Sequence, residues 1–259
     1  PLAESKAVAL GAVACGSAME AARHLTPDGV LIVVVVDAAQ TEAVLWGEGG
    51  AGPVLKPGQA VMLCPTLGPA TVQSQAERLA QMGIDFIDAP MSGGPVRAQE
   101  GTMSLMVACS DGVWQRSQKL LNALSQQVFR VGTRAGDGAR TKLVNNLLAA
   151  VNLVGAAEAM ALAERLGLDP AGTLSVIEAS SGQSWIGSDR MRRALAGDFE
   201  PRAHVTLLAK DTGLAVQAAD EVAFDPPLGR LARDLFAQAR GHGWADLDDA
   251  ALLKLMRQR

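Results

Sequence analysis

The sequence lacks the features that define several classes of protein. Its three cysteines, Cys15, Cys64 and Cys109, are odd in number and form no CxxC pair, so they indicate neither a disulfide framework nor a zinc site. The three histidines are scattered without metal-ligand spacing, and we expect no metal site. Unpaired cysteines are typical of a reducing compartment.

Long runs of one kind of residue are also missing. The longest aliphatic run, residues 30–36, is far shorter than the ~20 residues that cross a bilayer, and no signal peptide is recognisable at the start. The net charge is -4, the pI is about 5.4 and there is no long basic run, which argues against a nucleic-acid surface. We therefore expect a soluble, cytoplasmic protein without membrane or nucleic-acid partners.

What the chain has is enough apolar residue for a large core, 49% of 259 residues. Residues 1–135 alternate between β-branched runs and helical patterns, which is typical of a mainly parallel, doubly wound sheet. The predicted strands are 12–15, 30–36, 60–64, 84–88, 103–108 and 127–131, and the predicted helices are 3–10, 17–23, 39–46, 70–82 and 112–124. The run 30–36 is expected to be buried on both faces.

The second half changes character. After residue 166 every pattern is helical, with helices predicted at 170–180, 184–196, 203–222, 227–240 and 246–257. The sequence therefore predicts an α/β domain over residues 1–135, a long connecting helix over 136–165 and an all-helical domain over 166–259.

The connecting helix is the most informative stretch. From about Thr141 to Arg165 it is apolar on nearly every face, so we expect it to be buried. Its first turns nevertheless carry Lys142, Asn145 and Asn146, which share one face. Burial and the positive end of the helix both lower the pKa of an ammonium, which favours Lys142 as a proton-exchanging group. On spacing alone, a structural lysine at the end of a core helix is an equal alternative.

Five other segments are candidates for ligand binding. Residues 47–52 match GxGxxG but follow a helix instead of a strand, so we interpret them as a loop. Residues 36–38 and Thr66 follow strands, where doubly wound sheets bind ligands. The loop 88–95 combines Ser92 with glycines, a concavity suited to a carboxylate. Lys210-Asp211, judged by itself, is interpreted as a solvated ion pair on a helix face.

Taken together, these motifs resemble the β-hydroxyacid dehydrogenase family. The matching segments are 88–94 (DAPMSGG), 100–102 (EGT), Gly136-x-Gly138 with Lys142 and the two asparagines, and Lys210-Asp211. The segments 37–42, 184–191 and 197–199 look closest to the L-threonate dehydrogenase branch. The resemblance covers essentially the whole chain and implies a Rossmann-like NAD(P) domain joined by a long helix to an all-α domain.

The resemblance also implies roles for individual residues. Lys142 is the catalytic lysine, and Asn145 or Asn146 orients the substrate, a small hydroxy acid. The implied substrate-carboxylate loop is Ser92, Gly93 and Gly94; the implied cofactor contacts, to NAD or NADP, are Val36, Asp37, Ala38, Thr66 and Lys210, with Asp211 holding the site together. A homo-oligomer, dimer or tetramer, is expected by the same analogy.

The sequence departs from the family pattern in two respects, and two other functions are alternatives to a hydroxy-acid dehydrogenase. Related sequences often carry asparagine where Asp37 stands, and a carboxylate near cofactor phosphates is unfavourable. The family also begins with a strand, a GxGxxG turn, a helix and a second strand, so we expect a native N-terminal segment to precede residue 1. The alternatives are a related imine reductase, which usually lacks the lysine, and a non-catalytic Rossmann-like binding module.

Overall fold

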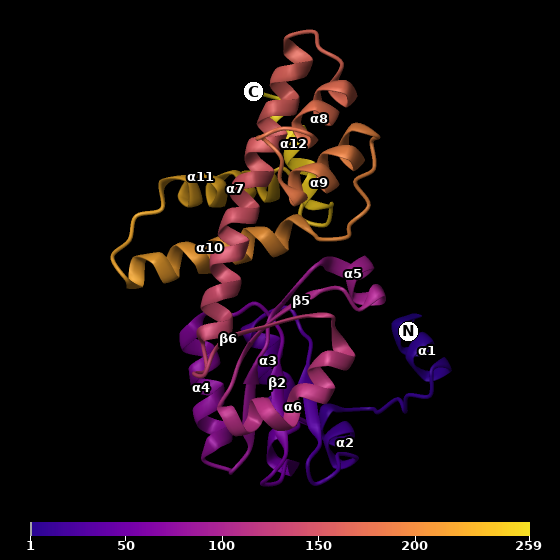
Figure 1. Ribbon diagram of the computed structural model, residues 1–259, viewed down its shortest axis with the longest axis vertical. Helices are drawn as coiled ribbons and strands as arrows, with labels where there is room; N and C mark the ends of the chain where they lie inside the picture. Colours follow the sequence, from indigo (N-terminus) through magenta and orange to yellow (C-terminus); the bar gives the residue numbers. More distant parts are fainter. Residues whose placement is uncertain (1) are drawn as a thin grey trace. The chain divides into compact units, whose positions relative to one another are not determined.

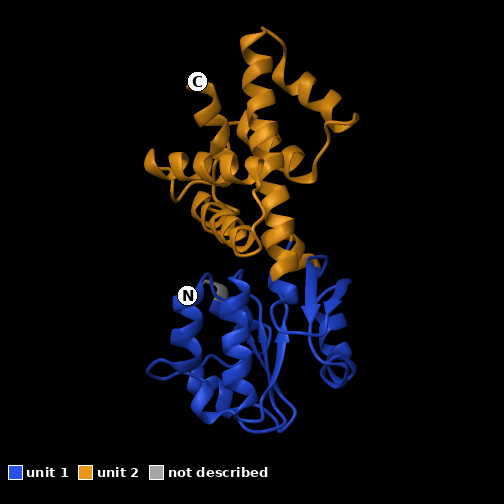
Figure 2. Ribbon diagram, turned by 90° about the vertical axis from the view of Figure 1, so that its left-hand side faces the viewer, with its two compact units in different colours: residues 1–92, 101–139 blue, residues 93–100, 140–259 orange. Residues whose placement is uncertain are grey.

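The computed structural model describes residues 2–259, with side chains from residue 4 onward. The chain forms two compact units, coloured separately in Figure 2. Unit 1 comprises the residues up to 92 together with 101–139, and unit 2 comprises 93–100 and 140–259. The long helix α7 (Asp137–Arg165) begins in unit 1 and continues through unit 2.

Unit 1 is built on a six-stranded sheet. Strands β1 (Val30–Val33), β2 (Ala60–Leu63) and β3 (Asp85–Asp88) are parallel, as the alternating pattern predicted. β5 (Ser104–Ala108) joins β3 antiparallel, β6 (Gln127–Gly132) runs parallel to β5, and the short β4 (Met91–Ser92) pairs antiparallel with β5. The sheet is therefore Rossmann-like but mixed.

Helices pack around the sheet of unit 1, except α1, which stands apart from the sheet at the end of an extended connection and is exposed (Figure 1). The helices of unit 1 are α1 (Leu2–Ala9), α2 (Ala18–Arg23), α3 (Ala38–Trp46), α4 (Pro69–Ala80) and α6 (Asp111–Leu124), with a 3-10 turn at Gly52–Val54. Side chains alternate across β2, so Val61 and Leu63 enter one apolar cluster and Met62 enters another. β2 is thus buried on both faces, as a central parallel strand should be.

Two strand predictions in unit 1 are wrong. Residues 12–15 form no strand. β1 ends at Val33, and Val34 and Val36 beyond it are 64% and 46% exposed, where burial on both faces was expected. The reason is that β1 pairs only with β2 among the described strands, so packing covers one side of it and leaves the rest open.

Unit 2 is helical, as predicted. Its helices are α8 (Pro170–Glu178), α9 (Trp185–Leu195), α10 (Val205–Glu221), α11 (Pro227–Gly241) and α12 (Leu252–Arg257), with a 3-10 turn at Asp249–Ala251. α10 and α11 lie side by side (Figure 1). Unit 2 also holds a helix that the sequence did not predict, α5 (Gly94–Glu100).

Helix α7 is the core helix of unit 2 along one face only. Leu153, Ala157 and Met160 are fully buried among the other helices. Val144 and Leu148 on another face are 70% and 61% exposed, so the expectation that the whole helix is buried is wrong. Although α7 is long and apolar enough to cross a membrane, its buried face accounts for much of that composition, because it supplies this core.

Candidate active site

Lys142 lies in the second turn of α7 and is buried, with 7% of its surface exposed. Burial lowers the pKa of its ammonium from 10.5 to about 8; the carboxylate of Asp211 opposes this change and the ammonium of Lys210 adds to it. The direction agrees with the sequence-based expectation. The chief cause is desolvation, since the field of a helix end fades within about one turn and Lys142 lies beyond it.

Asn146 connects the lysine helix to α10. Its side-chain amide donates to Asp211 Oδ2 at 2.6 Å, and both residues are buried. Asn145 is exposed, and its side-chain amide donates to the side-chain oxygen Oδ1 of Asn146 at 3.0 Å. The two asparagines, equivalent by spacing, therefore differ: Asn146 belongs to the buried network and Asn145 supports it from outside.

Asp211 is the centre of this network. Its Oδ1 lies 2.7 Å from Lys210 Nζ, and its side chain is only 9% exposed. The interpretation of Lys210-Asp211 as a solvated ion pair is therefore wrong for Asp211. Its partner Asn146 is 65 residues away in the chain, so no local pattern could reveal the contact.

A second buried carboxylate, Asp88, fixes the start of α7 within unit 1. Its Oδ2 accepts hydrogen bonds from the backbone N–H groups of Gly136 at 2.8 Å and Ala139 at 3.1 Å. Burial raises the pKa of Asp88 to about 6, and the backbone N–H donors oppose that rise. Backbone N–H groups at a helix N-terminus have no partner within the helix, so the carboxylate supplies the acceptor that they lack.

The glycines of the Gly136-x-Gly138 motif have separate structural reasons. Gly136 has a φ of 94°, which other residues rarely adopt. A Cβ on Gly138 would lie 2.8 Å from the Asp88 carboxyl carbon and 2.7 Å from the carbonyl oxygen of Met106. The motif therefore allows α7 to begin directly against the end of β3. Asp88 belongs to the DAPMSGG segment, but its role cannot be predicted from that segment because its partners lie 48 and 51 residues away.

The serine–glycine loop follows β3. Ser92 ends β4 and pairs with Ser104 of β5 in unit 1, whereas Gly93 and Gly94 open the α5 segment of unit 2. Gly93 and Gly94 have φ angles of 139° and 70°, a conformation that a side chain would strain. The turn is thus built around glycine, as the sequence indicated.

The remaining predicted residues lie in unit 1 at one edge of the sheet. Residues 36–38 follow β1 and Thr66 follows β2, and these strands are parallel neighbours, so both segments leave the sheet at its carboxyl edge. Asp37 is the N-cap of α3, and its side chain accepts a hydrogen bond from the Gln40 N–H at 2.8 Å. Residues 47–52 form a turn after α3, which confirms that this GxGxxG match is a loop.

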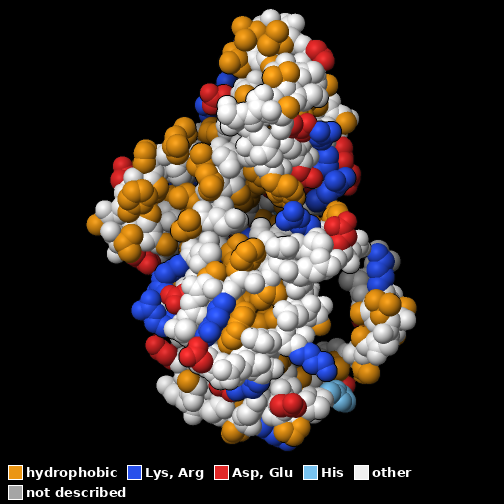
Figure 3. Space-filling view, viewed as in Figure 1, with side chains coloured by type: hydrophobic (Ala, Val, Ile, Leu, Met, Phe, Trp, Pro, Cys, Tyr) orange, Lys and Arg blue, Asp and Glu red, His pale blue; other side chains and the backbone are white. Residues whose placement is uncertain are grey.

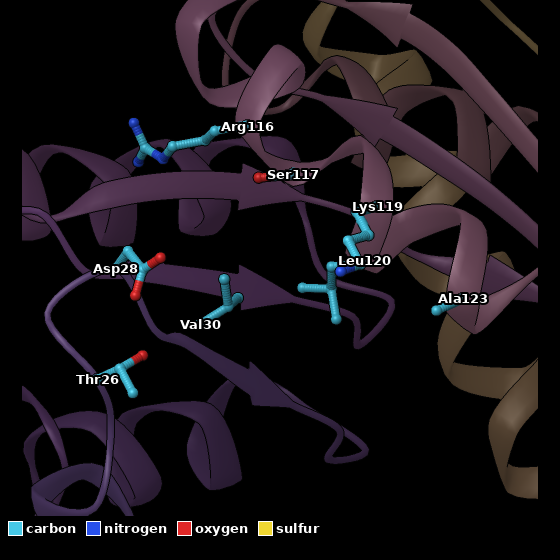
Figure 4. A pocket seen from close by; sticks show the side chains of 8 residues that line it. All are labelled: Thr26, Asp28, Val30, Arg116, Ser117, Lys119, Leu120 and Ala123. Carbon is cyan, nitrogen blue, oxygen red and sulfur yellow. The ribbon is translucent and has the colours of Figure 1, made fainter.

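A cavity in unit 1 contains none of the predicted site residues. It has a volume of about 470 Å³ and lies between the segment entering β1 and helix α6 (Figure 4). Thr26, Asp28 and Val30 line one side, and Arg116, Lys119 and Leu120 line the other. It stands at the amino end of β1, whereas ligands of doubly wound sheets bind at the carboxyl ends.

Comparisons with known proteins agree with this architecture. Residues 2–132 match the model for the NAD binding domain of 6-phosphogluconate dehydrogenase, and residues 136–256 match that for the NAD-binding domain of NADP-dependent 3-hydroxyisobutyrate dehydrogenase. L-threonate dehydrogenase of Escherichia coli K12 is 38% identical over 93% of this chain and 80% of its own length. 2-Hydroxy-3-oxopropionate reductase of the same strain is 30% identical over 96% of this chain and 84% of its own length.

A solved structure extends the similarity to three dimensions. The crystal structure of 3-hydroxyisobutyrate dehydrogenase from Salmonella typhimurium is 36% identical, with a TM-score of 0.91 over 98% of this chain and 88% of that one. The fold, the buried lysine and the similarity to these families together define a nicotinamide-dependent oxidoreductase. Such an enzyme transfers a hydride between NAD or NADP and a small hydroxy acid. Within that class the chain belongs to the β-hydroxyacid dehydrogenase family, in its L-threonate dehydrogenase branch.

Proposed function

We propose that Lys142 is the catalytic base of a dehydrogenase acting on an L-threonate-like or 3-hydroxyisobutyrate-like acid. The observation that carries this is a buried amine whose pKa is about 8. At pH 7 roughly one amine in ten is then neutral, against about one in three thousand at a pKa of 10.5. A neutral amine can accept the proton of the substrate hydroxyl.

Neighbouring polar groups of unit 2 are proposed to stabilise and orient Lys142. Asp211 stabilises the ammonium that forms when Lys142 takes the proton, and Asn146, held by Asp211, orients the substrate and the lysine. Asn145 is proposed to support Asn146. The Ser92 hydroxyl and the backbone N–H groups of Gly93 and Gly94 are proposed to bind the substrate carboxylate.

The chemistry of the predicted cofactor residues suits a nicotinamide dinucleotide, with one exception. Thr66 offers a hydroxyl, Lys210 offers a cation, and residues 36–38 begin a helix at the carboxyl edge of the sheet. The carboxylate of Asp37 caps that helix, so we propose that it contributes this cap and no contact to a phosphate. The cofactor, when bound, supplies the hydride acceptor.

Replacement of Lys142 tests the proposal. Lys142→Ala should lower kcat for hydroxy-acid oxidation by orders of magnitude, with nearly unchanged affinity for NADH or NADPH in a fluorescence titration. Lys119→Ala, at an exposed lysine of α6, is the matched control. Near-normal turnover of Lys142→Ala would refute the role. Reduction of cyclic imines in place of hydroxy-acid oxidation would favour an imine reductase, and failure to bind any nicotinamide would favour a non-catalytic module.

We further propose a homo-oligomer in the cytoplasm. Two neighbouring helices of unit 2 expose apolar side chains: Val144 and Leu148 on α7, and Leu228 and Leu231, 63% and 51% exposed, on α11. A Cβ on Gly229 of α11 would meet Leu147 of α7 at 2.5 Å, so the two helices pack here. Hydrophobic side chains also gather over the α10–α11 end in Figure 3. Such a patch is typical of a subunit interface.

A further inference from the structure

Arg97 is a cation beside the glycine turn, outside the network of Lys142, Asn146 and Asp211. It lies on α5, three residues after Gly94, so about 4.5 Å further along the helix axis. Its guanidinium carbon lies 5.2 Å from the centre of the Trp185 ring. No carboxylate among residues 4–259 pairs with Arg97, although most other arginines of unit 2 have one.

The Trp185 ring, over which Arg97 lies, is itself fixed by neighbouring residues. It is the first residue of α9, directly after the N-cap Ser184, whose hydroxyl accepts a hydrogen bond from the Gly187 N–H at 3.1 Å. The guanidinium of Arg190 lies 5.9 Å from the centre of the same ring. Half of the Trp185 surface is exposed, so the ring is anchored yet accessible.

Arg190, the second arginine on the Trp185 ring, belongs to a buried network of charged side chains. Arg190 Nε donates to Asp249 Oδ1 at 2.5 Å, and Arg190 also pairs with Asp189. Asp249 is 1% exposed. Arg190 therefore cannot leave the ring to meet a ligand without uncovering a buried carboxylate, which is costly. Of the two arginines on Trp185, only Arg97 can turn its donors to a ligand.

A guanidinium held over an aromatic ring has lost part of its rotamer freedom but none of its hydrogen-bonding donors, which lie at the edge of its plane. Such a preorganised fork binds oxygen acceptors at reduced entropic cost. The site residues Lys142, Asn146, Gly93 and Gly94 share a compact unit with Arg97. One turn beyond the glycines, Arg97 is suited to the end of the substrate that the carboxylate loop does not hold.

We propose that Arg97, whose guanidinium lies over the Trp185 ring, selects hydroxy acids whose chain carries hydroxyl oxygens beyond the reacting carbon. The preferred substrate is then a polyhydroxy acid of the L-threonate kind, and an acid with a methyl group there, such as 3-hydroxyisobutyrate, is disfavoured. This selection rests on the proposed function, because it assigns the carboxylate to the Ser92–Gly94 turn.

The ratio of kcat/KM for L-threonate to that for 3-hydroxyisobutyrate measures the selection. Arg97→Met keeps the apolar stem and removes the donors. It should lower kcat/KM for L-threonate by about ten- to a hundredfold, chiefly through KM, and leave that for 3-hydroxyisobutyrate within about twofold. Arg97→Lys should recover part of the loss. Arg240→Met, at an exposed arginine of α11, is the matched control and should change neither value.

The outcomes separate this inference from the proposed function. If the unaltered protein oxidises neither acid with NAD or NADP, the proposed function fails and the selection fails with it. If it oxidises both and Arg97→Met leaves the ratio unchanged, or lowers both values equally, only the selection by Arg97 is overturned. A preference of the unaltered protein for 3-hydroxyisobutyrate also overturns it.

A double-mutant cycle tests the contact between Arg97 and the Trp185 ring. Trp185→Leu should reduce the same ratio, and Arg97→Met combined with Trp185→Leu should lose little more than either variant alone, because each removes one element of a single arrangement. Fully additive losses would contradict a role for the ring. Thermal melting of all three variants shows that each is folded when its rates are measured.

Discussion

Two opposing effects act on the ammonium of Lys142: burial favours loss of its proton, and the negative charge of Asp211 favours keeping it. The balance sets the pKa of the amine near 8, within reach of neutral pH. Oxidation of a hydroxy acid needs the neutral amine, so kcat/KM for oxidation should rise with pH to a plateau above about 8. A pH–rate profile from pH 6 to pH 10 measures this midpoint.

Asp211→Asn provides the decisive comparison. Because the Asp211 charge raises the pKa of Lys142, its removal should shift the midpoint of the profile to lower pH. Asn146 can still hydrogen-bond to the new amide, so the change is chiefly one of charge. A midpoint that stays in place, or that moves to higher pH, would show that Asp211 does not act on the lysine in this way.

The same lysine should reduce stability. Its folded-state pKa of about 8 lies below the ordinary 10.5, so the folded state binds fewer protons between these values and stability rises with pH there. Below about pH 8 the whole destabilisation is present, and the difference between the two pKa values corresponds to roughly 3 kcal/mol. Lys142→Met should therefore stabilise the protein at pH 7.

Urea unfolding at two pH values checks this expectation. The gain from Lys142→Met should be largest at pH 7 and should have disappeared above about pH 10.5, where both states of the unaltered protein carry a neutral amine. Lys119→Met, at an exposed site, should show no such dependence. If Lys142→Met is less stable than the unaltered protein at pH 7, the buried amine does not lower the stability of the folded state.

Among the elements, the start of α7 depends on close contact between backbone and carboxylate. Gly138→Ala would place a methyl group 2.8 Å from the Asp88 carboxyl carbon and 2.7 Å from a backbone oxygen, neither of which can move freely. We expect a loss of about 1–3 kcal/mol in unfolding free energy and reduced activity, because the turn carrying Lys142 is displaced.

Gly155→Ala in the same helix is the matched control. A Cβ at Gly155 has open space around it, and alanine is the better helix former, so this variant should gain about 0.5–1 kcal/mol. Denaturant unfolding of the two variants separates the effects. Equal responses to the two substitutions would contradict the close packing of Gly138 on Asp88.

The elements that the sequence predicted are those with local causes. α2 and α3 begin where Ser17 and Asp37 cap them, and α7 extends over the apolar pattern as far as Arg165. α5 was missed because Gly-Gly-Pro is typical of a turn. The helix is only seven residues long, and Arg97 contacts Trp185, which is far away in sequence.

The residues of the candidate site, too, can be predicted from the sequence only where the cause is local. A lysine on an apolar helix and a serine–glycine turn are visible in the sequence, and so is their resemblance to a family. The choice between Asn145 and Asn146, the burial of Asp211 and the position of Asp88 all depend on partners about 50 residues or more away. The pattern of one segment cannot report which distant group covers it, and burial is what changes the pKa of these groups.

At the scale of the whole molecule, α7 and α11 expose an apolar face that a partner can cover. Val144 and Leu148 lie at successive turns of α7, on the part of the helix that also carries the proposed base. Apolar side chains of this size would be expected in a core, and each stabilises by roughly 1.5–3 kcal/mol when it is fully buried. A second copy of the chain would bury them in a symmetric contact.

Leu148→Glu should therefore weaken the assembly without unfolding the subunit. A carboxylate in an apolar interface is costly, whereas on the surface of a free subunit it is well solvated. Sedimentation velocity at several concentrations should show the unaltered protein as an oligomer and Leu148→Glu as smaller species, with an unchanged circular dichroism spectrum. Val176→Glu, at a 64% exposed valine of α8, is the matched control and should leave the sedimentation coefficient unchanged. If the unaltered protein sediments as a monomer at every concentration, this face has some other role, because no self-association is then available to bury it.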